Sequence, residues 1–180
     1  MNMDQELKQT IECVYELCEE VEKTLQKTVT LQNPLKALLQ TELMMYVMYL
    51  TVSDDRIELS ESQFLRDYLD YDFSPDEIAT FVQNNSVETF RQTVPYTFQL
   101  FVKADNLLYG RHGKVSLAAC ALYQMYETIG LALISADEEI DVQEYHDLAD
   151  FLTMLKAYMD QHLDSAKKRS VHSPPPNKKT

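Results

Sequence analysis

Apolar residues recur along the N-terminal segment at alternating spacings of four and three positions, with charged residues between them. This spacing places the apolar residues on one stripe of an α-helix and resembles the a/d pattern of a coiled coil. The stripe has two interpretations: it packs against the chain's own bundle, or it forms a homodimer through the N-terminal helix. Its residues are Leu7, Ile11, Val14, Cys18, Val21 and Leu25.

Two later segments, 35–52 and 114–135, are apolar on nearly every face, which predicts two central buried helices. An acidic stretch follows each of these segments. A further amphipathic segment comes after each acidic stretch, at 60–69 and at 142–163, and predicts a helix that packs one face on the core.

The two acidic stretches match each other at an offset of 83 residues, and the match continues downstream, where Leu65 pairs with Leu148. We therefore predict an all-α protein, a single helical bundle of about seven to eight helices with an internal pseudo-twofold helix–acidic turn–helix duplication. The aligned pairs of the acidic stretches are Asp54 with Asp137, Ile57 with Ile140, Glu58 with Asp141 and Glu61 with Glu144.

Two local signals concern the boundaries of elements. Ser74-Pro75, followed by Glu77, predicts a helix start in which Ser74 is the N-cap and Glu77 completes a capping box. The Gly110-Arg111-His112-Gly113 segment contains two of the three glycines and predicts a turn.

Charge and composition divide the chain into an N-terminal amphipathic helix at 1–33, a duplicated helical domain at 34–164 and a disordered, basic, Pro-rich tail at 165–180. The whole chain has 29 acidic and 16 basic residues and a formal net charge of -13. Residues 1–166 contain all 29 acidic residues but only 11 basic ones, a net charge of -18. Such a body repels phosphate backbones, so we expect no nucleic acid to bind the folded part.

The apolar runs and the cysteines bear on localisation. No basic segment followed by an apolar run begins the chain, and the long apolar run at 117–136 is interrupted by Gln124 and Glu127. Three cysteines do not form a disulfide framework of the kind found in small secreted domains. We expect a cytoplasmic protein without a membrane span.

Candidate chemistry concentrates in the two acidic stretches. Clusters of carboxylate oxygens suit hard cations such as Ca²⁺ or Mg²⁺ better than they suit zinc. Neither stretch is an EF-hand, because Leu65 and Leu148 stand where the twelfth-position glutamate would be. A structural alternative is open: carboxylates before a helix cap its free N–H groups, and Asp141 with Glu144 has capping-box spacing.

The pattern Asp-x-x-Ile-x-x-x-Glu occurs as Asp54-Ile57-Glu61 and again as Asp137-Ile140-Glu144. With its flanking helices and the duplication, it resembles the TerB-like (tellurite-resistance B-like) family over residues 35–163. The resemblance implies a single-domain helical bundle with pseudo-twofold repeats, a link to metal and stress responses, and cation binding at acidic surfaces. Asp55 and Glu138 occupy positions where the family usually has glycine. The metal ligands that the resemblance implies are Asp54, Glu58, Glu61, Asp137, Asp141 and Glu144.

Catalytic patterns fit the chain poorly. A di-iron bundle needs Glu-x-x-His, but Gln143 stands three residues before His146. We therefore expect a non-enzymatic, cytosolic TerB-like module that binds divalent cations weakly and acts through protein partners in stress or defence. The alternative is a metal-independent acidic immunity or adaptor protein that masks a basic partner surface. An enzyme of unrecognised type is a third hypothesis.

Overall fold

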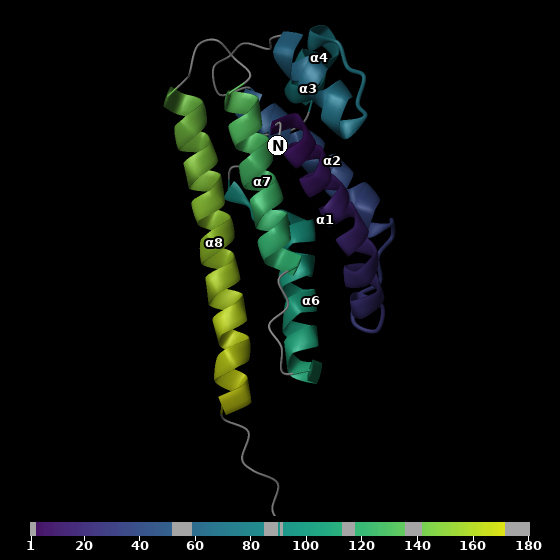
Figure 1. The fold of residues 1–180 in the computed structure, drawn as a ribbon, viewed down its shortest axis with the longest axis vertical. Coiled ribbons are helices and arrows are strands. Elements are labelled where there is room, and N and C mark those ends of the chain that lie inside the picture. Colours follow the sequence, from purple (N-terminus) through teal and green to yellow (C-terminus); the bar gives the residue numbers. More distant parts are fainter. Residues whose placement is uncertain are drawn as a thin grey trace, which may run out of the picture.

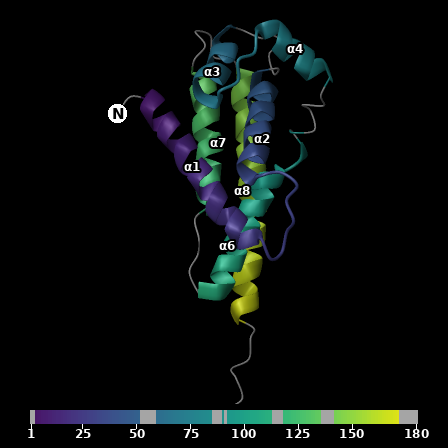
Figure 2. The same cartoon turned by 90° about the vertical axis from the view of Figure 1, so that its right-hand side faces the viewer.

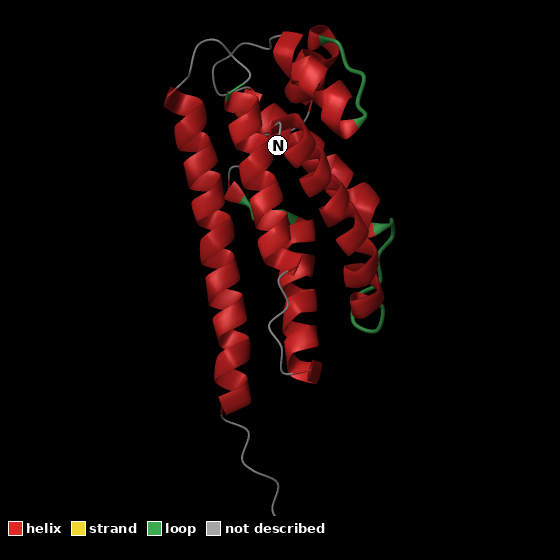
Figure 3. Ribbon diagram, viewed as in Figure 1, coloured by secondary structure: helices red, strands yellow, loops and turns green. Residues whose placement is uncertain are grey.

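The computed structural model describes residues 3–51, 59–84, 90, 92–112, 118–135 and 142–171. Within these ranges every regular element is a helix (Figure 3), which confirms the all-α prediction. The helices are α1 (Met3–Leu25), α2 (Leu35–Thr51), α3 (Leu59–Leu69), α4 (Pro75–Asn84), α6 (Tyr96–His112), α7 (Ala118–Ile134) and α8 (Val142–Val171).

The helices form an elongated bundle (Figure 1) in which α7 packs against α1, α6 and α8, and α2 packs against α1 and α3. The short helices α3 and α4 lie together at one end of the bundle, at the top of both views (Figure 2). In the part of the chain that the structure describes, no helix combines the length and the apolar character that crossing a membrane requires.

The apolar stripe of α1 is buried within the chain's own bundle. Each of its six predicted residues is at most 3% exposed, and α1 packs against α6, α7 and α2. The fold therefore agrees with the interpretation that the stripe packs against the chain's own bundle. The residues on which the homodimer interpretation depended are covered by helices of the same chain.

An aromatic cluster connects α2, α7 and α8 at the centre of the core. The ring of Tyr46 lies 5.0 Å from that of Tyr126, in an edge-to-face arrangement, and 4.8 Å from that of Phe151. The buried hydroxyl of Tyr46 donates a hydrogen bond of 2.9 Å to the backbone oxygen of Tyr126. Ring pairs of this kind contribute about 1 kcal/mol each beyond the burial of their area, so the cluster fixes how the three helices pack.

Gly130 allows α7 to approach its neighbours closely at this point. A Cβ atom at Gly130 would lie 2.5 Å from Leu148 Cδ1 and 2.5 Å from the Tyr46 hydroxyl. The absence of a side chain at Gly130 is therefore needed for both the α7–α8 contact and the Tyr46 hydrogen bond.

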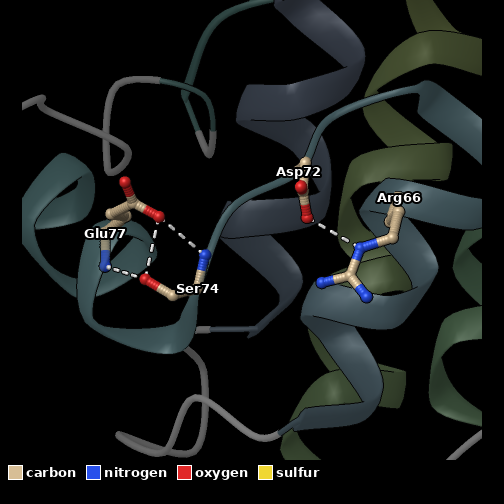
Figure 4. A network of polar contacts seen from close by, with 4 residues as sticks. All are labelled: Arg66, Asp72, Ser74 and Glu77. Carbon is tan, nitrogen blue, oxygen red and sulfur yellow. Dashed lines mark hydrogen bonds and ion pairs between the residues drawn. The ribbon is translucent and has the colours of Figure 1, made fainter.

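The predicted capping box at the start of α4 is present (Figure 4). The Ser74 N–H and hydroxyl donate to Glu77 Oε2 at 2.9 and 2.8 Å, and the Glu77 N–H lies 3.4 Å from Ser74 Oγ. Nearby, Arg66 Nε lies 2.7 Å from Asp72 Oδ1. The preceding helix, α3, ends before Asp70, which has a left-handed backbone conformation with φ of 59°.

The helix bounds show a regular spacing along the chain. Helices α2 and α7 have 17 residues each, and both their first and their last residues lie 83 positions apart. The first residues of α3 and α8 also lie 83 positions apart. This is the same offset at which the two acidic stretches align in the sequence.

Two elements differ from the expectations. Gly110, Arg111 and His112 form the last turn of α6 rather than a turn between helices, so that prediction is wrong for these three residues. Glycine is tolerated near a helix end, and α6 ends directly before Gly113, where glycine is commonest. Helix α8 continues to Val171, beyond the expected boundary at residue 164, because its last residues are helix formers whose positive charges suit a helix C-terminus.

Candidate functional site

The predicted metal ligands fall largely outside the described residues. Asp54, Glu58, Asp137 and Asp141 all do, while Glu61 lies within α3 without a described side chain. Glu144, in the first turn of α8, is described in full. The geometry of the two acidic stretches as ligand sets therefore stays a prediction.

The helix ends that flank the two acidic stretches share one end of the bundle. Helices α2 and α7 both end, and α3 and α8 both begin, at the top of Figures 1 and 2, since the two views share a vertical axis. The aromatic contacts between α2, α7 and α8 hold these helices together below that end. The fold thus brings to one end of the molecule two regions that are far apart in the sequence.

Two carboxylates are buried one turn apart at the start of α8. Glu144 is 6% exposed and Asp147 is 2% exposed. Gln143 Nε2 donates to Asp147 Oδ1 at 3.1 Å. A buried carboxylate is costly unless other groups stabilise its charge, and the positive end of the α8 dipole does so in part. Glu144, predicted as a ligand from its position in the repeat, therefore lies inside the bundle and not on an open surface.

The rest of the described acidic side chains do not gather into a metal site. Among the side chains described, no three from His, Cys, Asp and Glu are close enough to hold an ion together.

Two acidic side chains cap the central helices from the helix that precedes each. Glu22 Oε2, on α1, accepts a hydrogen bond of 3.0 Å from the Leu35 N–H at the start of α2. Asp105 Oδ2, on α6, accepts one of 2.9 Å from the Ala119 N–H at the start of α7. Glu22 and Asp105 are themselves 83 positions apart, while the N–H groups that they accept from, those of Leu35 and Ala119, are 84 positions apart. No local sequence signal predicts either cap, because donor and acceptor lie in different helices.

Glu42 joins α2 to the start of α6. Its carboxylate accepts hydrogen bonds from the Tyr96 N–H at 2.8 Å, from the Thr97 N–H at 3.1 Å and from the Thr97 hydroxyl. Burial raises the pKa of Glu42, and the hydrogen bonds from Thr97 and Tyr96 oppose that shift. These bonds satisfy N–H groups that every helix start leaves free, so a structural role accounts for this buried acid.

The buried phenols and the buried thiol are held in their neutral forms. Burial raises the pKa of Tyr46 and of Tyr126 well above the usual value. Burial also raises the pKa of the Cys18 thiol to about 12, whereas Cys13 on the same helix is exposed. The two buried phenols and the Cys18 thiol are therefore not prepared to act as anionic nucleophiles at neutral pH.

Comparisons with known proteins give no relative for the chain. No protein-family model, curated protein or solved structure matches it. The resemblance to the TerB-like family therefore stays a prediction that depends on the paired motif and on the spacing of the helices.

Proposed function

We propose that the chain is a non-enzymatic TerB-like helical module of the cytoplasm, in which two acidic turns form one acidic end. This end binds Ca²⁺ or Mg²⁺ weakly and contacts a protein partner in a stress or defence response. The observation that carries the proposal is the position of the four helix ends beside the acidic stretches, which all lie at one end of the bundle (Figures 1 and 2).

The proposal includes an internal duplication. Three observations support it: the matching bounds of α2 and α7, the matching starts of α3 and α8, and the two acidic caps provided by Glu22 and Asp105. All share the offset of 83 residues. Because α1 and α6 carry the equivalent caps, the proposed repeat extends to these helices, beyond the residues 35–163 of the TerB-like resemblance.

Charge provides the physical reason for a cation. The stretch 54–61 contains four carboxylates and the stretch 137–144 contains five. Residues 1–166 have a net charge of -18, so like charges gathered at one end of this body repel one another. A divalent ion would reduce that repulsion and accept oxygen ligands from both stretches. Weak binding is expected, since the turns lack the glycine that sharp ion-binding loops use.

Calorimetric titration with Ca²⁺ and with Mg²⁺ tests the proposal. The wild-type chain should release or absorb heat at millimolar ion, and Asp137→Asn/Asp141→Asn should not, with unfolding temperature rising only for the wild type. The chain has no tryptophan, so Tb³⁺ provides a second readout through tyrosine: excitation of Tyr145, which is 42% exposed beside Glu144, should sensitise bound Tb³⁺. The matched control Tyr145→Phe should lower the emission without changing the heat. If neither ion gives heat or shifts the unfolding temperature, the proposed cation binding is rejected.

The alternative function, a metal-independent acidic adaptor, is favoured by the charge of -18 on residues 1–166. A basic partner surface would then be covered by charge complementarity, and binding would weaken steeply with salt. Affinity capture from the native host, with and without a chelator, distinguishes the two. A partner retained in chelator but lost at high salt supports the adaptor.

A further inference from the structure

A hollow of about 480 Å³ crosses the surface of α6, between the segment that follows α1 and the distal part of α8. None of its described lining residues belongs to α3 or α4. Its volume falls within the range of small-molecule sites, which is roughly 300 to 1,000 Å³. The lining residues are Thr28, Val29, Tyr96, Gln99, Leu100, Val102, Lys103, Asn106, Tyr158 and His162.

The charge of this lining is opposite to that of the molecule. The chain has 29 acidic residues, yet none of them is among the described residues that line the hollow. Lys103 and His162 lie there instead, and Lys103 forms no ion pair within the described part of the chain. A lysine without a carboxylate partner, on a negative protein, is a local site for an anion.

An aromatic platform borders the hollow on α8. The His162 ring lies against the Tyr158 ring at a centroid distance of 4.1 Å and a tilt of 30°, and Phe98 meets Tyr158 edge-on at 6.4 Å. Burial raises the pKa of Tyr158, so its hydroxyl stays neutral and adds no negative charge at neutral pH. Planar groups stack favourably on rings held in this way.

Asn106 adds an unsatisfied polar group. Its Oδ1 atom is buried and has no hydrogen-bond partner. A buried acceptor without a partner is unfavourable, and rotation of the Asn106 side chain toward the hollow would let a donor on a bound molecule reach it. Because rotation of the amide exchanges its oxygen and nitrogen, Asn106 can serve as acceptor or as donor.

We propose that this hollow binds a small organic anion with a flat ring, whose carboxylate or phosphate lies near Lys103 and whose ring lies against Tyr158 and His162. The site is separate from the acidic end and does not depend on the proposed cation. Its ligand would be recognised by charge at α6 and by ring stacking at α8.

The test uses the full chain and four probes: phenyl phosphate, inorganic phosphate, neutral benzyl alcohol and cationic benzylamine. We expect phenyl phosphate to bind at millimolar concentration or below, more tightly than either inorganic phosphate or benzyl alcohol, and benzylamine to bind least. Amide chemical shifts should move on α6 and α8 around the hollow. Lys103→Gln should weaken phenyl phosphate about tenfold, as loss of a charged hydrogen bond predicts.

The matched control is Lys8→Gln, which changes the net charge equally at a lysine lying 5.4 Å from the Tyr68 ring centroid, away from the hollow. It should leave the affinity for phenyl phosphate unchanged. Tyr158→Leu should weaken the ring-bearing anion more than it weakens inorganic phosphate. The proposal is overturned if phenyl phosphate does not bind, if it binds no better than benzylamine, or if Lys8→Gln and Lys103→Gln have equal effects.

Discussion

The first and second halves of the chain have a similar arrangement of helices around the core. They differ in the length of the helix that follows the acidic stretch. In each half a central helix of 17 residues is capped by an acid from the preceding helix and leads through an acidic stretch to another helix. In the first half that helix, α3, has 11 residues and ends before the left-handed Asp70. In the second half, α8 has 30 residues and continues along α6. The core is therefore built by the parts that are alike in the two halves, and the hollow involves α8, in which the halves differ.

The same contrast holds on the surfaces of α1 and α6. Lys103 on α6 stands 83 positions after Glu20 on α1, and both residues are exposed. The distal part of α8, with Tyr158 and His162, has no equivalent after α3, because α3 ends too early. The charge at Lys103 and the length of α8 therefore occur together in the second half, which contributes most of the described lining of the proposed anion site, while Thr28 and Val29 come from the first half.

The largest expected effect comes from making the halves alike at one core position where their residues differ in size. Val47 on α2 and Gly130 on α7 are 83 positions apart, and both are buried. Gly130→Val should lower the free energy of unfolding by about 3 kcal/mol through overpacking. The physical reason is the 2.5 Å approach that even a Cβ atom would make to Leu148 and to the Tyr46 hydroxyl. Urea unfolding followed by circular dichroism measures the change.

Gly130→Ala measures how much the close contact contributes, because two effects oppose each other there. Helix propensity alone predicts a gain of about 1 kcal/mol for alanine over glycine, whereas the contacts predict a loss. Leu131→Ala on the same helix, at a side chain that is 43% exposed, serves as the control and should change stability by no more than about 0.5 kcal/mol. A stabilised Gly130→Ala would contradict the observed packing of α7 against α8.

The next effect concerns the two acidic caps. Removal of either cap should destabilise its own half of the bundle. Asp105→Ala should cost about 2 kcal/mol and Glu22→Ala about 1 kcal/mol, since each leaves a helix N–H without its acceptor. The larger cost at Asp105 follows from its burial, because it is 1% exposed and water cannot replace the lost acceptor. Thermal and urea unfolding give both values.

Glu19→Ala is the matched control for these caps, since Glu19 is an exposed acid of α1 whose carboxylate lies 3.7 Å from Lys23 Nζ. Its loss should change stability by no more than about 0.5 kcal/mol. If Glu22→Ala or Asp105→Ala behaves like the control, the caps are not equivalent and the proposed repeat loses one of its supports.

Much of the fold was predictable because it depends on local patterns. The α1 stripe, the all-apolar segments of α2 and α7 and the capping box at Ser74 each follow from residues a few positions apart. Tertiary contacts were not predictable in the same way. The hydrogen bond from Tyr46 to Tyr126 joins residues 80 positions apart, and nothing near either residue indicates it.

The candidate site shows the same division between local and distant information. The sequence placed Glu144 in a repeat of carboxylates but did not predict that its side chain is only 6% exposed. It did not predict the hollow at Lys103 either, because the lining comes from the segment after α1, from α6 and from α8. A lysine on a helix surface has no local signal that tells whether a carboxylate lies nearby. Only the packing of distant segments decides whether a carboxylate lies near the lysine.

The smallest expected effect tests the start of α4. In the first half α4 is a separate helix after α3, whereas the residues 83 positions later belong to the single long helix α8. Ser74→Ala should lower the free energy of unfolding by about 1 kcal/mol, because the start of α4 loses its N-cap. The hydrogen bonds from Ser74 lower the pKa of Glu77 below its ordinary value of 4.5. A lowered carboxyl pKa gives stability that is present above pH 4.5 and lost as pH falls through the folded-state value.

The difference in stability between the wild type and Ser74→Ala should therefore be largest at neutral pH and should narrow in acid. Glu77→Gln is the matched variant, and its stability relative to Ser74→Ala/Glu77→Gln should not change with pH over this window. Urea unfolding at several pH values measures both comparisons. Neither substitution should alter the binding of phenyl phosphate, because α4 does not line the hollow. A change in that affinity would show that the first half controls the site that we assign to the second.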